Sequence, residues 1–219
     1  MLKQPDEFMT LSSQAITFVK DHKRQFDYLG LAVLGLIIIY LGWYAYVRYI
    51  NNKGQDAYNN AYYTMLKNTD TAKDQENQKK KEELFNRVIN DYGSSKAARL
   101  AVPQLADAKF AQKKYDEAIA KYEEYLGKLS ENDPYQYLTM LSLSVCYEEK
   151  GDYEKAIQSL EKIIAAGTDD FFKEQAMLSL ARVYRLSGKQ DKSNETLKQF
   201  KEKFPKSVFL ELADAFMKS

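Results

Sequence analysis

The sequence has little of what metal sites, disulfide frameworks and nucleic-acid surfaces require. One Cys and one His occur among 219 residues, whereas a disulfide framework or a Cys-based zinc site needs several thiols at defined spacings. The 32 Lys and Arg residues are balanced by 31 Asp and Glu residues, so no basic excess is available to follow a phosphate backbone. We therefore expect no metal site and no nucleic-acid partner.

Flexible and fibrous chain classes are excluded as well. Four Pro and nine Gly are too few for a linker-rich or collagen-like chain, and a hydrophobic content of 45% is too high for general disorder. Tyr is instead over-used, with 17 residues against 11 Phe and 1 Trp. Tyrosine suits half-buried surfaces, where the ring packs and the hydroxyl stays in contact with water. The composition predicts an ordered domain and indicates no reaction.

One segment near the N-terminus is apolar enough to cross a lipid bilayer. From Tyr28 to Val47 the chain reads YLGLAVLGLIIIYLGWYAYV, without a charge. As a helix this segment is about 30 Å long, the thickness of a hydrocarbon core. Aromatic residues of the kind that favour membrane interfaces gather at its second end, namely Tyr40, Trp43, Tyr44, Tyr46 and Tyr49. We therefore expect a transmembrane helix over residues 28–49.

A buried core helix and a cleaved signal peptide are the two alternatives to a membrane anchor. A buried core helix rarely runs five turns without a polar face. A cleaved signal peptide has a shorter apolar region and a small-residue cleavage site, whereas Trp43, Tyr44 and Arg48 end this segment. Both alternatives fit the sequence less well than a retained anchor.

The anchor divides the chain into three regions. Residues 1–27 carry a helical stripe of apolar side chains, which predicts an amphipathic tail on the inner membrane surface: Phe8, Leu11, Ala15, Phe18 and Val19. Basic residues before and after the anchor nearly balance, but long domains cross membranes largely regardless of charge. We expect the tail in the cytoplasm and residues 50–219 outside it.

The region after the anchor repeats every 37 or 38 residues. Three passages align from Leu105, Leu143 and Leu180, and each combines an aromatic, a tight turn, a small residue and a large apolar residue. The aromatics are Phe110, Tyr147 and Tyr184; the small residues are Ala118, Ala156 and Ser193; the large ones are Tyr122, Leu160 and Leu197. A small residue lets two antiparallel helices approach, and the large one fills the gap to the next pair.

The turns and ends of these repeats can also be predicted. Gly151 and Gly188 are expected to end the first helices in the left-handed conformation, a position that Lys113 occupies in the first passage. Stepping back 37 residues from Tyr122 reaches Phe85, in the second helix of a weaker unit. Its first helix is expected over residues 57–66, followed by a polar loop over residues 67–80. A capping helix is expected over residues 208–217.

This pattern resembles the tetratricopeptide repeat (TPR). The best match is the middle passage, through Leu143, Ser144, Tyr147, Gly151, Tyr153, Ala156 and Leu160. The period exceeds the usual 34 residues, and the resemblance covers residues 57–218. It implies an all-α fold: a TPR-like solenoid of three to four helix pairs plus a capping helix, preceded by one transmembrane helix.

The whole architecture resembles the YfgM-like family of bacterial inner-membrane TPR proteins. The features that carry this resemblance are Phe18 in the tail, Gly42 and Trp43 at the outer end of the anchor, and GTDDFFKEQA at residues 167–176. Members are known as ancillary subunits of the Sec translocon and are linked to periplasmic chaperones. The resemblance implies a periplasmic location for the repeats.

No set of residues predicts a catalytic site. His22 has no partner for a triad, Cys146 is expected to be a buried hydrophobic residue, and neighbouring carboxylates such as Glu148 and Glu149 point about 100° apart on a helix. No phosphate-binding glycine loop occurs. We expect no catalytic residues and no cofactor, and an enzyme is the least supported of the functions considered.

The TPR resemblance implies a partner-binding groove along the first helices of the units. Its candidate residues are Asp107, Phe110, Leu141, Val145, Glu148, Leu178, Arg182 and Arg185. Their mixed character suggests a protein or peptide partner. The open alternative is that the units and the C-terminal helix fill the groove themselves.

The expected function is therefore a membrane-anchored scaffold. Its partners would be translocon subunits or chaperones, or alternatively envelope assembly factors for the cell wall or outer membrane. A second candidate contact is the segment of Tyr58, Tyr62 and Tyr63, unless it packs against the next unit.

Overall fold

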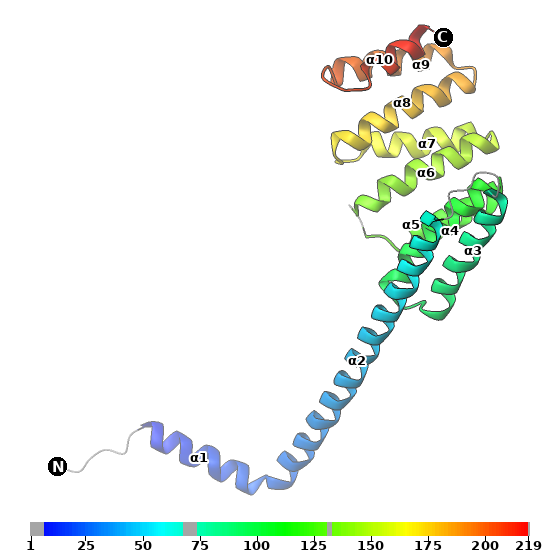
Figure 1. The fold of residues 1–219 in the computed structure, drawn as a ribbon. Coiled ribbons are helices and arrows are strands. Elements are labelled where there is room, and N and C mark those ends of the chain that lie inside the picture. Colours follow the sequence, from blue (N-terminus) through cyan, green and yellow to red (C-terminus); the bar gives the residue numbers. More distant parts are fainter. Residues whose placement is uncertain (1–6, 68–73, 131–132, 219) are drawn as a thin grey trace. The chain divides into compact units, whose positions relative to one another are not determined.

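The computed structural model describes residues 7–67, 74–130 and 133–218, which form ten helices and no strand (Figure 1). They divide into two compact units, residues 1–50 and 51–219.

The first unit consists of α1 (Glu7–Asp21) and the beginning of α2 (Lys23–Lys67). The predicted helix in the tail is present, with Phe18 and Val19 exposed, while the side chains of Phe8, Leu11 and Ala15 lie outside the described set. Among the described residues, α2 is the one helix long and apolar enough to cross a bilayer, and its apolar stretch is not buried. The structure therefore gives no support to a buried core helix.

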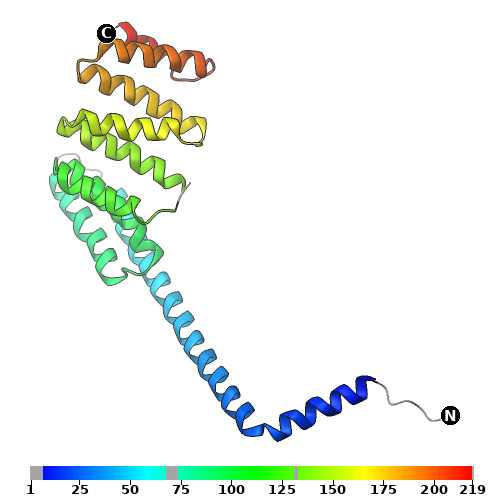
Figure 2. The same cartoon turned by 180° about the vertical axis from the view of Figure 1, so that it is seen from behind.

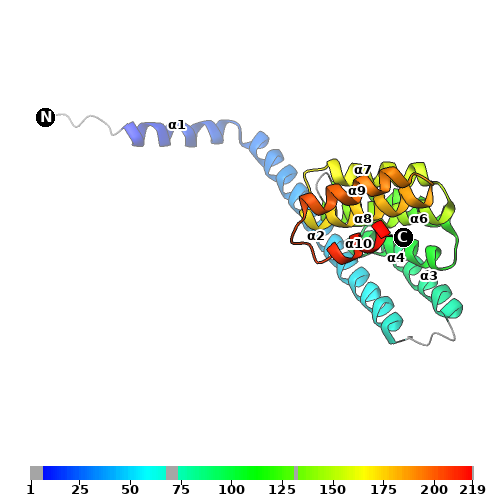
Figure 3. The ribbon, with the colours of Figure 1, turned by 90° about the horizontal axis from the view of Figure 1, so that it is seen from above.

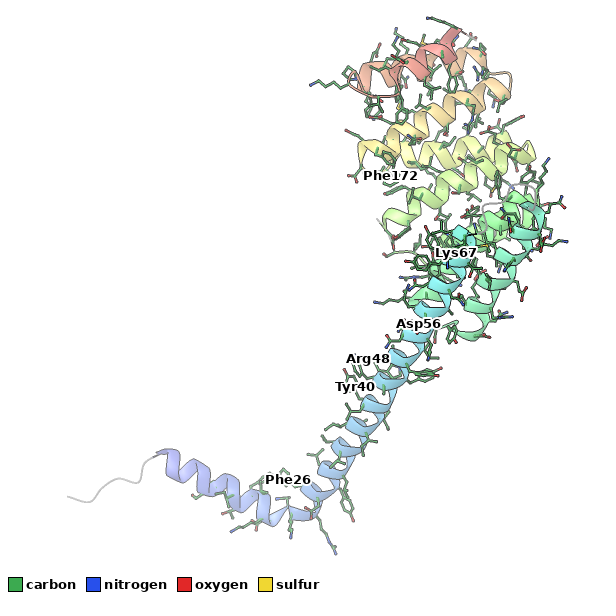
Figure 4. The ribbon with its side chains drawn as sticks, viewed as in Figure 1. Phe26, Tyr40, Arg48, Asp56, Lys67 and Phe172 are labelled. Carbon is green, nitrogen blue, oxygen red and sulfur yellow. The ribbon has the colours of Figure 1, made fainter. Side chains whose placement is uncertain are left out.

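The apolar stretch of α2 ends in the expected aromatic cluster. Tyr40, which Figure 4 labels together with Arg48, lies 6.2 Å from Trp43 and 6.4 Å from Tyr44 between ring centroids. The helix then continues without a break to Lys67. The expected first helix over residues 57–66 is therefore the C-terminal part of α2.

The second unit is a stack of helix pairs, as the repeat pattern predicts. The C-terminal part of α2 and α3 (Asp74–Asp91) precede three pairs: α4 (Lys96–Ala111) with α5 (Tyr115–Leu126), α6 (Pro134–Lys150) with α7 (Tyr153–Ala165), and α8 (Asp170–Leu186) with α9 (Gln190–Lys203). The short α10 (Leu210–Lys218) caps α9. Consecutive helices contact one another from α3 to α10, and α6 also contacts α8 (Figure 2). Seen along the stack, α7 and α9 lie on one side, and α6 and α8 on the other (Figure 3).

Two boundaries differ from the sequence prediction. The segment predicted as a loop over residues 67–80 is helical from Asp74, because Gln, Glu and Lys are good helix formers even without apolar periodicity. Residues 68–73 of that segment lie outside the described residues. The capping helix starts at Leu210, after a turn in which the Ser207 hydroxyl accepts a 3.1 Å hydrogen bond from the Phe209 amide.

The turns inside the pairs share one hydrogen-bond pattern. Gly151 and Gly188 have φ angles of +79° and +75°, and Lys113 takes the same left-handed conformation at +59°. In each turn an amide bonds to a carbonyl five residues earlier, from Asp152 to Tyr147 at 2.8 Å for example. The left-handed ends of the first helices are therefore confirmed, including the one that lacks Gly.

The predicted core positions are buried. The small residues Ala118, Ala156 and Ser193, with Leu160 and Leu197 after them, are almost inaccessible to water. Phe85, identified by counting one period back, is buried against α4 in a cluster with Val88, Ala97 and Ala101. Small residues thus allow neighbouring helices to approach closely, and the buried large residues fill the space between them.

Candidate partner-binding groove

The groove candidates come from the first helices of three successive pairs. Asp107 and Phe110 lie on α4, three candidates on α6, and three on α8. The structure joins α6 to α8 directly, because Oε2 of Glu148 accepts hydrogen bonds from Nη2 and Nε of Arg182 at 2.9 and 3.2 Å. Leu141 and Val145 lie half-buried on α6.

At the α8 end, the protein itself occupies part of the candidate surface. Leu178 is only 6% exposed and belongs to a core cluster with Ala181 and Leu197. The guanidinium of Arg185 lies 4.9 Å from the ring of Phe216 in α10. The expected alternative, in which the C-terminal helix fills the groove, therefore describes this end of the stack, and Leu178 is not available to a partner.

At the α4 end, the surface stays open. The side chain of Asp107 is 45% exposed, with one oxygen accepting a 2.5 Å hydrogen bond from the Tyr122 hydroxyl and the other 3.9 Å from Nζ of Lys81. Phe110 is half-buried against the main core cluster, with its ring 5.6 Å from Tyr115. Asp107 is thus held in place but remains accessible.

A recess of about 330 Å³ lies beside Asp107, between the C-terminal part of α2 and helices α4, α5 and α6. Sequence reasoning named Asp107 and Tyr58 as candidate contacts but missed most other residues that line it, which include Leu100, Pro103, Tyr125, Tyr135 and Leu138. Pro103 lies inside α4, so it lacks the amide hydrogen that would bond to the Arg99 carbonyl. We call this cavity the tyrosine recess.

Some of these residues could have been found from the sequence. Leu100 and Pro103 lie seven and four positions before Asp107, which places them on the same face of α4. The sequence does not indicate that Tyr122 and Tyr125 line a surface recess. The repeat pattern in fact assigns Tyr122 to the interior. Only the packing of α5 under α4 and α6 brings their rings to the recess.

Three phenols of the recess have a raised pKa and therefore stay neutral. Burial raises the pKa of Tyr58, Tyr122 and Tyr125, and the carboxylate of Asp107 raises the pKa of the first two further. Neutral hydroxyls can both donate and accept hydrogen bonds. The recess therefore presents aromatic faces, hydroxyl groups and one carboxylate.

The surroundings of Cys146 and His22 do not suggest a catalytic role. Cys146 is fully buried, as expected, and burial raises the pKa of its thiol to about 12. A thiol with this pKa stays protonated and is a poor nucleophile. The His22 ring lies 4.4 Å from Phe18, its neighbour one helical turn away in sequence.

The three tyrosines of the second candidate contact have different surroundings in the structure. Tyr58 packs its ring 5.5 Å from Phe85 of α3, as the packing alternative expects. Tyr62 and Tyr63 are exposed.

Solved structures with a similar fold are TPR proteins. A "putative kinesin light chain" with "nearly identical TPR-like repeats" from Podosopora anserina is 16% identical, with a TM-score of 0.60 over 76% of this chain and 84% of that chain. A tetratricopeptide repeat protein from Parabacteroides merdae is also 16% identical, with a TM-score of 0.57 over 74% of this chain and 59% of that chain. These likenesses concern the fold alone. No curated protein matches the sequence.

The sequence also matches the family model of the tetratricopeptide repeat-like domain, over residues 22–145 and 126–215. The two matches together span most of the chain and include all the predicted repeats. The chain belongs to the tetratricopeptide repeat-like domain family.

Proposed function

We propose that this protein is a membrane-anchored scaffold that binds protein or peptide partners through the groove face of α4 and α6. The observation that carries this proposal is the open tyrosine recess beside Asp107, in a fold whose relatives are TPR proteins. Helical repeats of this kind present extended surfaces to other proteins. The α8 end contributes less, because Leu178 and Arg185 already have partners within the chain.

The proposed anchor is the segment from Tyr28 to Val47. Its large apolar side chains are exposed, Leu31 and Ile39 by more than 60% each. Covering each such side chain with lipid stabilises the bound state by roughly 1.5–3 kcal/mol. We expect the full chain to stay in the membrane pellet after extraction with alkaline carbonate, and release into the supernatant would contradict the anchor.

The proposed topology places residues 1–27 in the cytoplasm, the anchor over residues 28–49 and residues 50–219 in the periplasm of a bacterial inner membrane. An alkaline phosphatase fused after Ser219 is then expected to be active, since this reporter requires an oxidising compartment. A green fluorescent protein fused at the same position is expected to be dark. The opposite pair of results would reverse the orientation.

The proposed partners are Sec translocon subunits or periplasmic chaperones, as the YfgM-like resemblance implies. An anchor confines the repeats to the membrane surface and so raises their effective concentration near a membrane complex. Affinity purification of the tagged full chain from detergent-solubilised membranes, followed by mass spectrometry, tests this identity. Recovery of envelope assembly factors instead would favour the alternative client, and recovery of no specific protein would contradict the scaffold.

A pair of variants tests whether the groove binds the partner. Leu138 is 45% exposed in the recess, so Leu138→Lys introduces a positive charge there without emptying the core. Gln158→Lys adds the same charge on the exposed surface of α7. We expect the first change to reduce partner recovery at least tenfold and the second to leave it unchanged. Equal recovery with both variants would place the binding surface elsewhere.

A further inference from the structure

We propose that the tyrosine recess receives an Arg or Lys side chain of the partner. This inference rests on the proposed scaffold function and names the chemistry of what the groove binds. Both first helices α4 and α6 line the recess, so a peptide that follows the groove passes over it. Its volume of about 330 Å³ is at the lower end of the range for ligand pockets, roughly 300–1,000 Å³, and leaves room for a long side chain.

The recess is aromatic on several sides. Tyr122 and Tyr125 are 4% and 1% exposed and form its buried part, while Tyr58 is half-buried and Tyr135 is 51% exposed at the rim. The faces of such rings carry partial negative charge and attract ammonium and guanidinium groups. Four tyrosines contributed by α2, α5 and α6 therefore favour a cation over an anion.

The charge of the lining also favours a cation. Among the described residues that line the recess, Asp107 is the sole charged side chain. One of its oxygens is bonded to Tyr122, yet a carboxylate has about four acceptor positions, so it can accept further hydrogen bonds. Lys81 forms an ion pair with the other oxygen from the α3 side, but at 3.9 Å it does not fill a hydrogen-bond position of the carboxylate.

Other occupants fit less well. An acidic side chain would be repelled by Asp107. A phenyl or aliphatic side chain would cover this carboxylate and leave it without a new partner, which is costly. An Arg or Lys side chain can both cover the apolar lining and pair with the carboxylate. Its apolar stem can pack on Leu100, Pro103 and Leu138 while its charged end reaches Asp107.

The test uses the full chain in phospholipid nanodiscs and a library of random 12-residue peptides displayed on phage, with empty nanodiscs for subtraction. We expect the enriched peptides to share an Arg or Lys. Replacing that residue by Gln in a synthetic, fluorescently labelled peptide is expected to weaken binding at least tenfold. Enrichment of acidic or aromatic residues without a shared cation would overturn the inference.

A charge-neutral variant separates recognition from folding. Asp107→Asn keeps an oxygen that accepts from Tyr122 and removes the charge, so we expect about tenfold weaker binding of the basic peptide and unchanged binding of its Gln version. Asp116→Asn makes the same change at a carboxylate that is 79% exposed on α5 and outside the recess, and is expected to have no effect. Equal affinities for all three proteins would contradict the role of Asp107.

A second variant tests the aromatic contribution. Tyr135→Leu removes an exposed ring at the rim without opening the core. We expect this change to weaken binding of the basic peptide severalfold more than binding of the Gln peptide. If purification recovers partners with wild-type protein while no peptide depends on Arg or Lys, the scaffold function stands and the basic-residue inference fails. If neither partners nor peptides are captured, the proposed function fails first.

Discussion

The hydroxyl of Tyr147 donates a 2.9 Å hydrogen bond to Oε1 of Glu123 across the boundary between two helix pairs. Tyr184 repeats this bond with Glu161 at the next boundary, at 3.0 Å. Both tyrosines stand at the aromatic position of the repeat, where the first passage has Phe110. The repeat period therefore carries a polar contact between successive pairs as well as apolar packing.

Removing one of these hydroxyls is expected to weaken the stack. Tyr147→Phe and Tyr184→Phe each keep the ring and lose the bond to a carboxylate, which is expected to lower the free energy of unfolding by about 1–2 kcal/mol. Urea unfolding of the full chain in detergent micelles, followed by circular dichroism, measures the change. Tyr63→Phe is the control, because that ring is 60% exposed, and a shift there as large as at Tyr147 would contradict the argument.

The same two tyrosines predict how stability depends on alkaline pH. Burial, followed by the hydrogen bonds to Glu123 and Glu161, raises the pKa of Tyr147 and of Tyr184 from 10.0 to about 12. A group whose pKa is raised by folding contributes its full stability below pH 10 and loses it as pH rises from about 10 to 12. The unfolding free energy of the wild type is therefore expected to fall more steeply between pH 9.5 and 11 than that of the double Phe variant. Parallel curves would show that these phenols are not linked to folding.

The left-handed conformation of Lys113 predicts a stabilising substitution. A side chain in this conformation costs roughly 1–2 kcal/mol, while Gly loses more entropy on folding, so Lys113→Gly is expected to raise the unfolding free energy by about 0.5–1 kcal/mol. Gly151→Ala is the reverse change at the equivalent turn and is expected to lower it by about 1 kcal/mol. Thermal unfolding of both variants checks the pair, and shifts of the same sign would contradict this explanation.

A close approach at Gly54 predicts a destabilising substitution. A Cβ atom added there would lie 2.5 Å from Oγ of Ser95, the residue that caps α4 by accepting from the Ala98 amide. Gly54→Ala is therefore expected to lower the unfolding free energy by about 1–3 kcal/mol, despite the higher helix propensity of Ala. Gly30→Ala, with no atom within 4 Å of the added Cβ, is the matched control and is expected to be neutral or slightly stabilising. Equal midpoints of thermal unfolding for the two variants would contradict the predicted clash.

Much of the architecture followed from local patterns. The repeat of Leu143 and Leu180 predicted the helix pairs, Gly151 and Gly188 predicted their turns, and counting one period back from Tyr122 located the buried Phe85. These features depend on residues close together in sequence, and helix periodicity, capping and backbone conformation are set at that range.

The availability of the groove was not predictable in the same way. Leu141 and Leu178 occupy the same position of the repeat, yet only Leu178 is buried in the core formed with Ala181 and Leu197. From the repeat pattern alone, equivalent positions are expected to have equivalent burial. The last unit departs from this expectation because the chain continues into α10, which packs against α9.

The sequence by itself determined that the chain forms paired helices with a fixed period, and that one segment near the N-terminus is long and apolar enough for a membrane. Only the tertiary structure decided where the stack is open, because solvent exposure depends on neighbours from other helices. Tyr58 and Tyr135 are 77 residues apart in the numbering, yet they line one recess with Asp107. Such a cavity arises from the packing of helices against one another, and no single segment encodes it.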